Sequence, residues 1–404
     1  MGELKRISLV TKIESKGWYE STPTSIPPST GKIDVALLSY LMRRFGMGTA
    51  DWPSQFVHGF PILGSLSQDY VFPISNKLEP RPLGPSSIFD SAPERFRERA
   101  RRNPKEQIVL RKEAMGQVER GWLAPPVLLN KFGQIDAAPK SKINPVFRFP
   151  VFQSDKVRAI DDLRRGLVNR FCVIDSLNVP PSWDRIAEII LPINGIDRNW
   201  DFIKGDHESA YKNLPLSPPR SRFCVITFKN HIDSKWYGFE AKTHIFGAVA
   251  SVLHYNVFSR LIASLANRVF GIPILGYVDD FGAPVPGGVS EIALRVFQDF
   301  CQILGVVLGK SKCSALHTIT FLGLLGEFPD ISNNMTLSIS LTAGKSIKWR
   351  DRLRTIVKQK SISRADLESI IGKLGFSQTA VFHRFARTMM NPLYAKLYAR
   401  PFHE

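Results

Sequence analysis

Residues 272–284 read IPILGYVDDFGAP and set two adjacent carboxylates, Asp279 and Asp280, between two short apolar runs. Short apolar runs bounded by Gly and Pro are typical of strands joined by a turn. The sequence therefore predicts a β-hairpin with both acids at its tip. Acids in exposed turns are common, so the meaning of this pair depends on what else the chain brings close to it.

A third acid ends another apolar run upstream. Residues 202–206 read FIKGD and end on Asp206, and the strand-like run FCVITF follows at 223–228. Three carboxylates at neighbouring strand ends could hold two Mg²⁺ ions about 3.5 to 4 Å apart, which clamps the attacking and leaving oxygens in phosphoryl transfer. A single Asp at such a place is more often a turn or helix cap. We predict Asp206 and Asp279 as catalytic metal ligands, and Asp280 as a third ligand or a close neighbour of the ligands.

The order and spacing of these motifs resemble the palm of reverse transcriptases over roughly residues 145–330. Motif C of that family is Tyr-x-Asp-Asp, which residues 277–280 match, and residues 206–211, DHESAY, resemble motif A. Other similar stretches are motif B at 246–251, motif D at 304–312, the primer grip at 321–323 and a fingers segment at 156–169. Within the family, residues 206–215 and 367–374 are most similar to retroelement enzymes of the tyrosine-recombinase (DIRS-like) type.

The resemblance implies an α+β fold of the right-hand polymerase type, with fingers, palm and a helical thumb. A strand, a helix and a hairpin in that order predict a palm made of an antiparallel sheet with helices on one face. The predicted parts are a Pro/Gly/Ser-rich N-terminal extension at 1–90, a charged helical segment at 91–140, fingers at 141–200, palm at 201–330 and a basic helical thumb or connection at 331–404.

Local patterns predict the elements inside these parts. Helices are expected at 35–41, within 92–119, at 186–191, from 248 to 267 and across 340–397, where Ser363 and Asp366 make a capping start. Strands are expected in the palm at 201–205, 222–228 and 236–240, and short antiparallel strands in the fingers across 146–173.

The resemblance also implies residues that bind the incoming nucleotide. Tyr211, five residues after Asp206, would stack under the deoxyribose and exclude a 2′-hydroxyl by steric clash. The alternative is a half-buried strand tyrosine. Arg158 would clamp the triphosphate with its planar guanidinium, with Asp161 or Asp162 as its ion-pair partner. The predicted nucleotide-binding residues are Arg158, Lys156, Ser209, Ala210, Tyr211, Phe246, Gly247 and Lys310.

Two further assignments stay open at this point. Lys310 and Lys312 compete for the lysine of motif D, a proton donor to pyrophosphate, and the sequence does not choose between them. Contacts with primer and template are predicted for Tyr277, Ser251, Phe321, Leu322 and Gly323. A core position is the alternative for Tyr277, and an ordinary helical serine is the alternative for Ser251.

The charge of the chain indicates a polyanionic partner. Its formal net charge is +18 over 404 residues, and residues 341–404 contain thirteen Lys or Arg against four Asp or Glu. Half of the net charge therefore falls in the last sixth of the chain. A basic excess also favours solubility, but its concentration at one end is typical of a nucleic-acid surface.

Cysteine spacing and hydropathy indicate an intracellular protein. Cys172, Cys224, Cys301 and Cys313 are scattered, so neither a zinc site nor a disulfide framework is predicted and a reducing compartment is expected. The chain has neither a secretory pattern nor a run of about eighteen apolar residues, so we expect no secretion and no membrane partner. A cytoplasmic or nuclear location follows.

The sequence thus predicts an RNA-directed DNA polymerase of a retroelement. Its partners would be an RNA template, a DNA primer and product, and deoxynucleoside triphosphates, and its cofactor two Mg²⁺ ions, with Mn²⁺ as a substitute. One rival is a viral-type RNA-dependent RNA polymerase with the same palm. Another is an inactive palm that serves as a nucleic-acid-binding scaffold.

Overall fold

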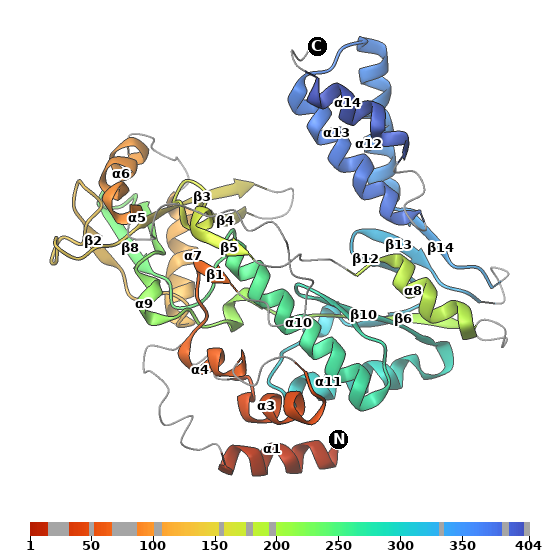
Figure 1. Cartoon of the computed structure of the whole chain (residues 1–404). Coiled ribbons are helices and arrows are strands. Elements are labelled where there is room, and N and C mark those ends of the chain that lie inside the picture. Colours follow the sequence, from red (N-terminus) through yellow and green to blue (C-terminus); the bar gives the residue numbers. More distant parts are fainter. Residues whose placement is uncertain are drawn as a thin grey trace. The chain divides into compact units, whose positions relative to one another are not determined.

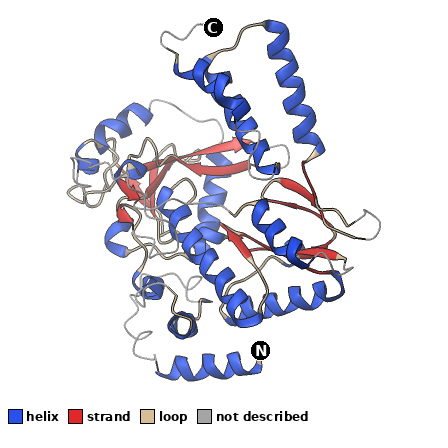
Figure 2. Ribbon diagram, turned by 45° about the vertical axis from the view of Figure 1, so that its right-hand side comes forward, coloured by secondary structure: helices blue, strands red, loops and turns tan. Residues whose placement is uncertain are grey.

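The computed structural model of the chain describes residues 1–14, 32–47, 52–66, 87–100, 107–152, 157–174, 181–193, 199–330, 335–381 and 388–399. Lys156, one of the predicted nucleotide-binding residues, lies outside them. Two compact units are each assembled from separate stretches of sequence. Unit 1 comprises Met1–Val179, His207–Leu265 and Asp299–Val307, and unit 2 comprises Pro180–Asp206, Ala266–Gln298 and Leu308–Glu404. Both contain helices and strands, so the predicted mixed helix and sheet class is confirmed (Figure 2).

The larger sheet of unit 1 has five strands in the order β2-β8-β7-β3-β4. They are β2 (Val127–Leu129), β3 (Pro145–Phe152), β4 (Val157–Asp161), β7 (Val225–Lys229) and β8 (Trp236–Glu240). β3 and β4 are antiparallel, as predicted, but β3 pairs with β7 in parallel. β7 and β8, which we predicted as palm strands, therefore share a sheet with β3 and β4. The physical reason is that the apolar β7 is buried along almost its whole length, which suits a strand with neighbours on both sides.

The helices of unit 1 start with α1 (Gly2–Glu14), which lies beside α3 (Val35–Arg44) at the red end of the chain in Figure 1. Asp34 caps α3 by accepting the backbone N–H of Leu37 at 3.0 Å, and Lys12 of α1 pairs with the same carboxylate at 3.1 Å. The predicted helices at 35–41 and within 92–119 are confirmed. Other short elements are η2 (Trp52–Ser54), α4 (Gln55–His58), β1 (Gly64–Leu66), α5 (Ser87–Asp90), α6 (Ala92–Ala100), α7 (Gln107–Glu119), η3 (Val168–Phe171), β5 (Cys172–Ile174), η5 (Ala210–Asn213) and α9 (Pro218–Ser221).

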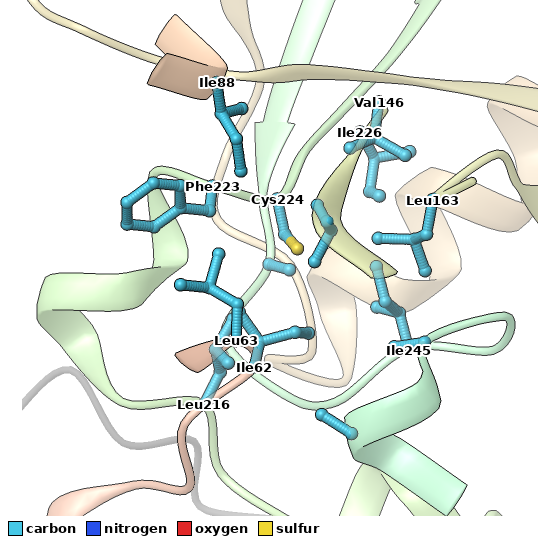
Figure 3. Packing of buried hydrophobic residues seen from close by; sticks show 14 of the residues in the cluster. Ile62, Leu63, Ile88, Val146, Leu163, Leu216, Phe223, Cys224, Ile226 and Ile245 are labelled. Carbon is cyan, nitrogen blue, oxygen red and sulfur yellow. The ribbon is translucent and has the colours of Figure 1, made fainter. Parts of the chain in front are cut away.

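The core of unit 1 draws side chains from widely separated parts of the sequence. Figure 3 shows Ile62 and Leu63 near Leu216, with Phe223 and Ile245 in the same cluster. Ile62 and Leu63 belong to the stretch that we predicted as an N-terminal extension. Because both side chains are almost completely buried, this part of the stretch is a structural component of unit 1.

The larger sheet of unit 2 is antiparallel, with the strand order β11-β6-β10-β9. Its strands are β6 (Trp200–Asp206), β9 (Leu275–Tyr277), β10 (Asp280–Pro286) and β11 (Ser314–Leu316). β9 and β10 form the predicted hairpin, and Val278 and Asp279 are its turn. Val278 has φ 51°, which is an outlier for a β-branched residue. The positive φ is what allows so short a turn between the two strands.

Helices cover both faces of this sheet. On one face, Phe281 of β10 packs against Phe297 of α11 (Ser290–Ile303), with ring centroids 5.5 Å apart. On the other face, Phe202 of β6 stacks on Trp183 of α8 (Trp183–Ile190) at 6.3 Å. Our prediction of helices on one face was therefore wrong. The reason is that the aromatic side chains of β6 and β10 point in opposite directions, and each set needs cover.

The C-terminal part of unit 2 has a second sheet followed by three helices. β12 (Thr318–Phe321), β13 (Leu324–Glu327) and β14 (Ser338–Leu341) are antiparallel neighbours. The helices α12 (Ala343–Gln359), α13 (Arg364–Ser377) and α14 (Asn391–Tyr398) form the blue end of the chain in Figure 1. Ser363 caps α13 by accepting the backbone N–H of Asp366 at 3.2 Å, as predicted. Single turns of 3-10 helix are η4 (Leu191–Ile193), η6 (Gly287–Val289), η7 (Lys310–Lys312) and η9 (Gln378–Ala380).

The helix predicted at 248–267 is α10 (Val249–Phe270), which has 22 residues. Among the described residues it is the helix long and apolar enough to cross a membrane, with a mean hydropathy of 1.2 in its most apolar window. Of that window, 78% is buried inside the protein, which is typical of a core helix. All four cysteines are free thiols in the structure.

Candidate catalytic site

The three predicted metal ligands lie in unit 2 at adjoining strand ends. Asp206 is the last residue of β6 and pairs directly with Asp280, the first residue of β10, in antiparallel register. Residues in such a pair point to the same face of a sheet, with β-carbons about 4.5 to 5.5 Å apart. Asp279 occupies the turn next to Asp280. The structure therefore brings together the carboxylates that the sequence separates by more than seventy positions.

Each of the two paired acids has a lysine partner. Lys312 of η7 binds Asp206 with Nζ 2.6 Å from Oδ1, and Lys204 of β6 lies 3.4 Å from Oδ1 of Asp280. Lys204 also donates to the carbonyl oxygen of Thr320 at 3.3 Å. Because the side chain of Lys312 is 59% exposed, its ion pair adds little to stability. Its main effect is to place positive charge among the acids.

The pKa of the Asp279 carboxyl reports the crowding of negative charge. Burial raises this pKa above its ordinary value, and the nearby charges of Asp206 and Asp280 raise it further. The hydrogen bond with Asp206 raises the pKa of Lys312, and the charges of Asp279 and Asp280 add to this effect. The largest causes differ, but the charges of neighbouring carboxylates contribute to both shifts. A cation bound there would relieve the repulsion.

The carboxylate oxygens of the three acids are of the kind that hard divalent cations such as Mg²⁺ prefer as ligands. Mg²⁺ prefers carboxylate oxygens and is bound by one or two carboxylates together with substrate phosphates. Within the described ranges, no three His, Cys, Asp or Glu side chains converge closely enough to hold a metal ion as they stand. Oδ1 of Asp206 faces Lys312. Metal binding through Asp206 and Asp279 would therefore require Lys312 to give up part of this contact.

A cavity of about 360 Å³ borders Asp280 within unit 2. Three of the residues predicted to contact primer and template line it, namely Tyr277, Leu322 and Gly323. Leu322 and Gly323 have φ of 49° and 78° and form the turn between β12 and β13, where positive φ at both positions is typical of a type I′ hairpin. This turn presents its backbone beside the acidic site.

Phe321 is not a contact residue. Its ring is fully buried and lies 4.9 Å from the ring of Phe202, so it is part of the core beneath the turn. Ser251 of α10 is also fully buried, and its hydroxyl donates to the carbonyl oxygen of Ile245 at 2.8 Å and lies 3.0 Å from Nδ1 of His244. The prediction that Ser251 and Phe321 touch primer or template was wrong, because neither side chain reaches the surface.

Tyr211, the predicted sugar contact, lies in unit 1 and has aromatic neighbours on two sides, Phe246 and Tyr255. Tyr211 stands in η5, is 7% exposed, and meets Phe246 edge-on with ring centroids 5.0 Å apart. Phe246 is 47% exposed and precedes Gly247, whose φ is 90°. A β-carbon on Gly247 would lie 3.0 Å from the carbonyl oxygen of Asp161, so only glycine fits here without displacement. Phe246 is therefore the more accessible residue of this pair.

The other predicted nucleotide-binding residues lie on several different elements. Ser209 has φ 56° and Ala210 is buried at the start of η5, so both shape the backbone before Tyr211. Arg158 is exposed on β4 and Lys310 is exposed on η7. Of the two acids predicted as partners of Arg158, Asp161 has a different one. It pairs with the buried Arg148, with Nε 2.7 Å from Oδ1 and Nη2 3.0 Å from Oδ2.

Four more residues contribute, of which three had no role in the sequence interpretation and the fourth, Lys312, was one of its two candidates for the motif D lysine. Asn169 binds both sides of the loop after Phe246, donating to the Gly247 carbonyl oxygen at 2.9 Å and accepting the Val249 N–H at 3.0 Å. Such a long-range side-chain bond leaves no local pattern in the sequence. Strand periodicity could have identified Lys204, which stands two positions before Asp206 and so faces the same side. The four residues are Lys204, Lys312, Asn169 and Tyr255.

No family model matches the chain, and no curated protein matches it. Among solved structures it is similar to foamy viral protease-reverse transcriptase in three forms. The complex with RNA/DNA hybrid has a TM-score of 0.48, 18% identity, and covers 73% of this chain and 34% of that chain. The dRH form with double-stranded DNA has a TM-score of 0.48, 17% identity, and coverage of 91% and 54%.

The third form, in complex with double-stranded DNA, has a TM-score of 0.43, 15% identity, and coverage of 95% of this chain and 65% of that chain. The chain thus spans between a third and two thirds of the length of these structures. A likeness at these TM-scores and identities carries no argument about chemistry. The functional assignment rests on the residues of this chain.

Proposed function

We propose that the protein is an RNA-directed DNA polymerase that extends a primer 3′-hydroxyl with deoxynucleotides by two-metal phosphoryl transfer. The observation that carries the proposal is the register of β6 and β10, which sets Asp206 directly opposite Asp280 with Asp279 in the adjoining turn. Opposed like charges destabilise a sheet. Such a pair at two strand ends is better explained by a bound cation than by stability.

Two Mg²⁺ ions, when bound, would lower the pKa of the primer hydroxyl and neutralise charge on the triphosphate. Asp206 and Asp279 would hold them, since Asp206 ends β6, Asp279 stands in the turn before β10, and the charge of Asp206 acts on Asp279. Lys312 would stand beside the transferred phosphates with positive charge and N–H donors. Tyr277 and the Leu322–Gly323 turn would border the primer terminus, because they line the cavity beside Asp280.

The choice of a deoxynucleotide substrate is supported by Tyr211. A tyrosine ring held against Phe246 would not shift to make room, so it would reject an added hydroxyl by steric clash. The proposal for an RNA template rests on the sequence resemblance. The net charge of +18 supports a nucleic-acid partner of either kind.

Primer extension tests the proposal. We expect the protein to elongate oligo(dT) on poly(rA) with dTTP in the presence of Mg²⁺, and Asp206→Asn to reduce the extension to background. The amide keeps the size of the side chain but removes the ligand charge. Because Asp201 on the same strand binds Ser290 at 2.7 Å on the opposite face, Asp201→Asn is the matched control and should remain active. Equal extension by wild type and Asp206→Asn would refute the proposal.

A second candidate is a catalytically inactive nucleic-acid-binding scaffold. The ion pairs of Lys312 with Asp206 and of Lys204 with Asp280 favour it, because lysine can balance these carboxylates without metal. A scaffold would bind a primer–template duplex with salt-dependent affinity but would not extend it with any nucleotide or divalent cation. The same extension assay, paired with a duplex-binding titration, separates the two functions.

A further inference from the structure

The ring of Tyr211 is enclosed by two other aromatic side chains of unit 1. Phe246 meets it at 5.0 Å and 68°, and Tyr255 of α10 meets it at 5.8 Å and 86°. Both are edge-to-face contacts, which fix the tilt of a ring as well as its position. Tyr211 itself stands in η5, a single turn of 3-10 helix. The two ring contacts therefore restrict the tilt of the Tyr211 ring.

Tyr255, the second of these neighbours, is itself held in place by contacts on α10 and with His207. The hydroxyl of Tyr255 forms a hydrogen bond with Nδ1 of His207, which is 1% exposed. The ring of Tyr255 also meets Phe258 at 5.9 Å, one turn along α10. Phe258 in turn packs against Phe56 at 5.2 Å, in the N-terminal part of the chain. Tyr255 therefore has little freedom to move when Tyr211 presses on it.

We propose that Tyr255 is a positioning residue for sugar selection, which holds the Tyr211 ring upright against the incoming ribose through its own bond to His207. The inference rests on the proposed polymerase function and goes beyond it, because Tyr255 is 0% exposed and would act on the nucleotide only through Tyr211. A ring that rejects a 2′-hydroxyl by steric clash works only while it cannot tilt away. Selectivity against ribonucleotides thus depends on the layer beneath the ring as well as on the ring.

The role of Tyr255 predicts a graded series of variants. Tyr255→Leu removes the edge contact with the Tyr211 ring, so discrimination against ribonucleotides should fall by about three- to tenfold. Tyr255→Phe keeps the ring but removes the bond to His207, so it should lower discrimination by less. Tyr211→Ala removes the wall itself and should lower it most. In all three variants the catalytic carboxylates are unchanged.

The experiment is single-nucleotide addition on one primer–template, with kcat/KM measured for dTTP and for the ribonucleotide UTP. Phe228→Leu is the matched control, because Phe228 is a buried aromatic of unit 1 that stacks on Phe239 at 5.2 Å. This variant loses core packing but should keep the wild-type ratio of the two kcat/KM values. A purely structural role for Tyr255 would lower both values together and leave the ratio unchanged.

The outcomes are distinct. A reduced ratio in Tyr255→Leu, with a smaller reduction in Tyr255→Phe and none in Phe228→Leu, supports the inference. An unchanged ratio in Tyr255→Leu, in an assay where Tyr211→Ala loses selectivity, overturns it while the polymerase function stands. If Tyr255→Leu does not fold, an unchanged ratio in Tyr255→Phe has the same meaning. Failure of the wild-type protein to add any nucleotide overturns both.

Discussion

Asp206 and Asp280 face each other across the antiparallel pair of β6 and β10, on the same side of the sheet. Like charges in this relationship are destabilising, and burial of Asp279 beside them adds to the repulsion. The fold thus contains a local excess of negative charge that two lysines only partly balance. Sites that reduce the stability of the fold in this way are typical of functional sites, so removing one of these charges should raise stability and lower activity.

Asp279→Asn should stabilise the metal-free protein while abolishing primer extension. The raised pKa of Asp279 means that the folded state binds its proton more tightly than the unfolded state does. At neutral pH this difference opposes folding, and the neutral amide removes it. We expect a higher thermal midpoint for the variant without divalent cations, measured by differential scanning fluorimetry at pH 7.

The matched control is Asp233→Asn, in a loop of unit 1. There the hydrogen bond from Tyr237 lowers the pKa of the carboxyl, so its charge favours the folded state. This variant should not be stabilised and should retain primer extension. A lower thermal midpoint for Asp279→Asn than for the wild type would contradict the electrostatic account of the site.

Lys312→Ala should impair nucleotide addition more than Lys310→Ala does. Both lysines are exposed on the same turn, but Lys312 contacts Asp206 at 2.6 Å and lies in the field of all three acids. The measurement is kcat for addition of one deoxynucleotide at saturating substrate. The larger loss in the Lys310 variant would show that Lys312 serves only as a counter-charge for Asp206.

Asn169→Ala should weaken nucleotide binding by releasing the loop at Gly247. Its amide makes two hydrogen bonds with this loop, and a hydrogen bond of this kind contributes about 1 kcal/mol to stability. We expect the KM for the deoxynucleotide to rise while kcat changes little. Asn130→Ala is the control, because Asn130 accepts the N–H groups of Phe132 and Gln134 in a separate loop. An equal rise in KM for both variants would indicate a general loss of stability.

Acid should unfold the protein partly through His244 and His254. Burial lowers the pKa of His254 to about 4, and burial and the charge of His254 place the pKa of His244 well below 6.5. Both rings are therefore neutral in the fold, and their contribution is constant above the unfolded pKa of about 6.5. Below it the unfolded state takes up protons first, so stability falls as pH drops toward about 4.

For His254 alone, the expected loss between pH 7 and pH 5 is about 2 kcal/mol. Urea unfolding of the wild type and of His254→Gln at both pH values measures this loss. The glutamine keeps an N–H donor for the carbonyl oxygen of Pro61, which His254 now binds at 3.0 Å. If the variant loses as much stability as the wild type between these pH values, His254 does not titrate as described.

The sequence predicted those features of the fold that depend on local pattern. The hairpin at Asp279 is confirmed, because two apolar runs and a short polar turn are read from neighbouring residues. The cap of α13 by Ser363 is confirmed for the same reason. The parallel pairing of β3 with β7 was missed, since pairing between strands about eighty residues apart depends on tertiary packing.

Only part of the candidate site was predicted, because sequence motifs do not give the direction of a side chain. A shared motif order identified the carboxylates, but the same motifs suggested surface roles for Ser251 and Phe321, which burial excludes. Motif position gives the neighbourhood of a residue in the chain and not the direction of its side chain. Lys204, Asn169 and Tyr255 make contacts with residues distant in sequence. A single sequence therefore does not reveal Asn169 or Tyr255, and it indicates Lys204 only through the alternation of side chains along a strand.

Diffraction from crystals of the protein with a primer–template, an incoming deoxynucleotide and Mn²⁺ tests the central claim most directly. The account predicts two anomalous peaks about 3.5 to 4 Å apart, one or both within bonding distance of Asp206 and Asp279, with Lys312 moved away from Asp206. A bound duplex with no peak near these carboxylates, and with Lys312 still paired with Asp206, would contradict it.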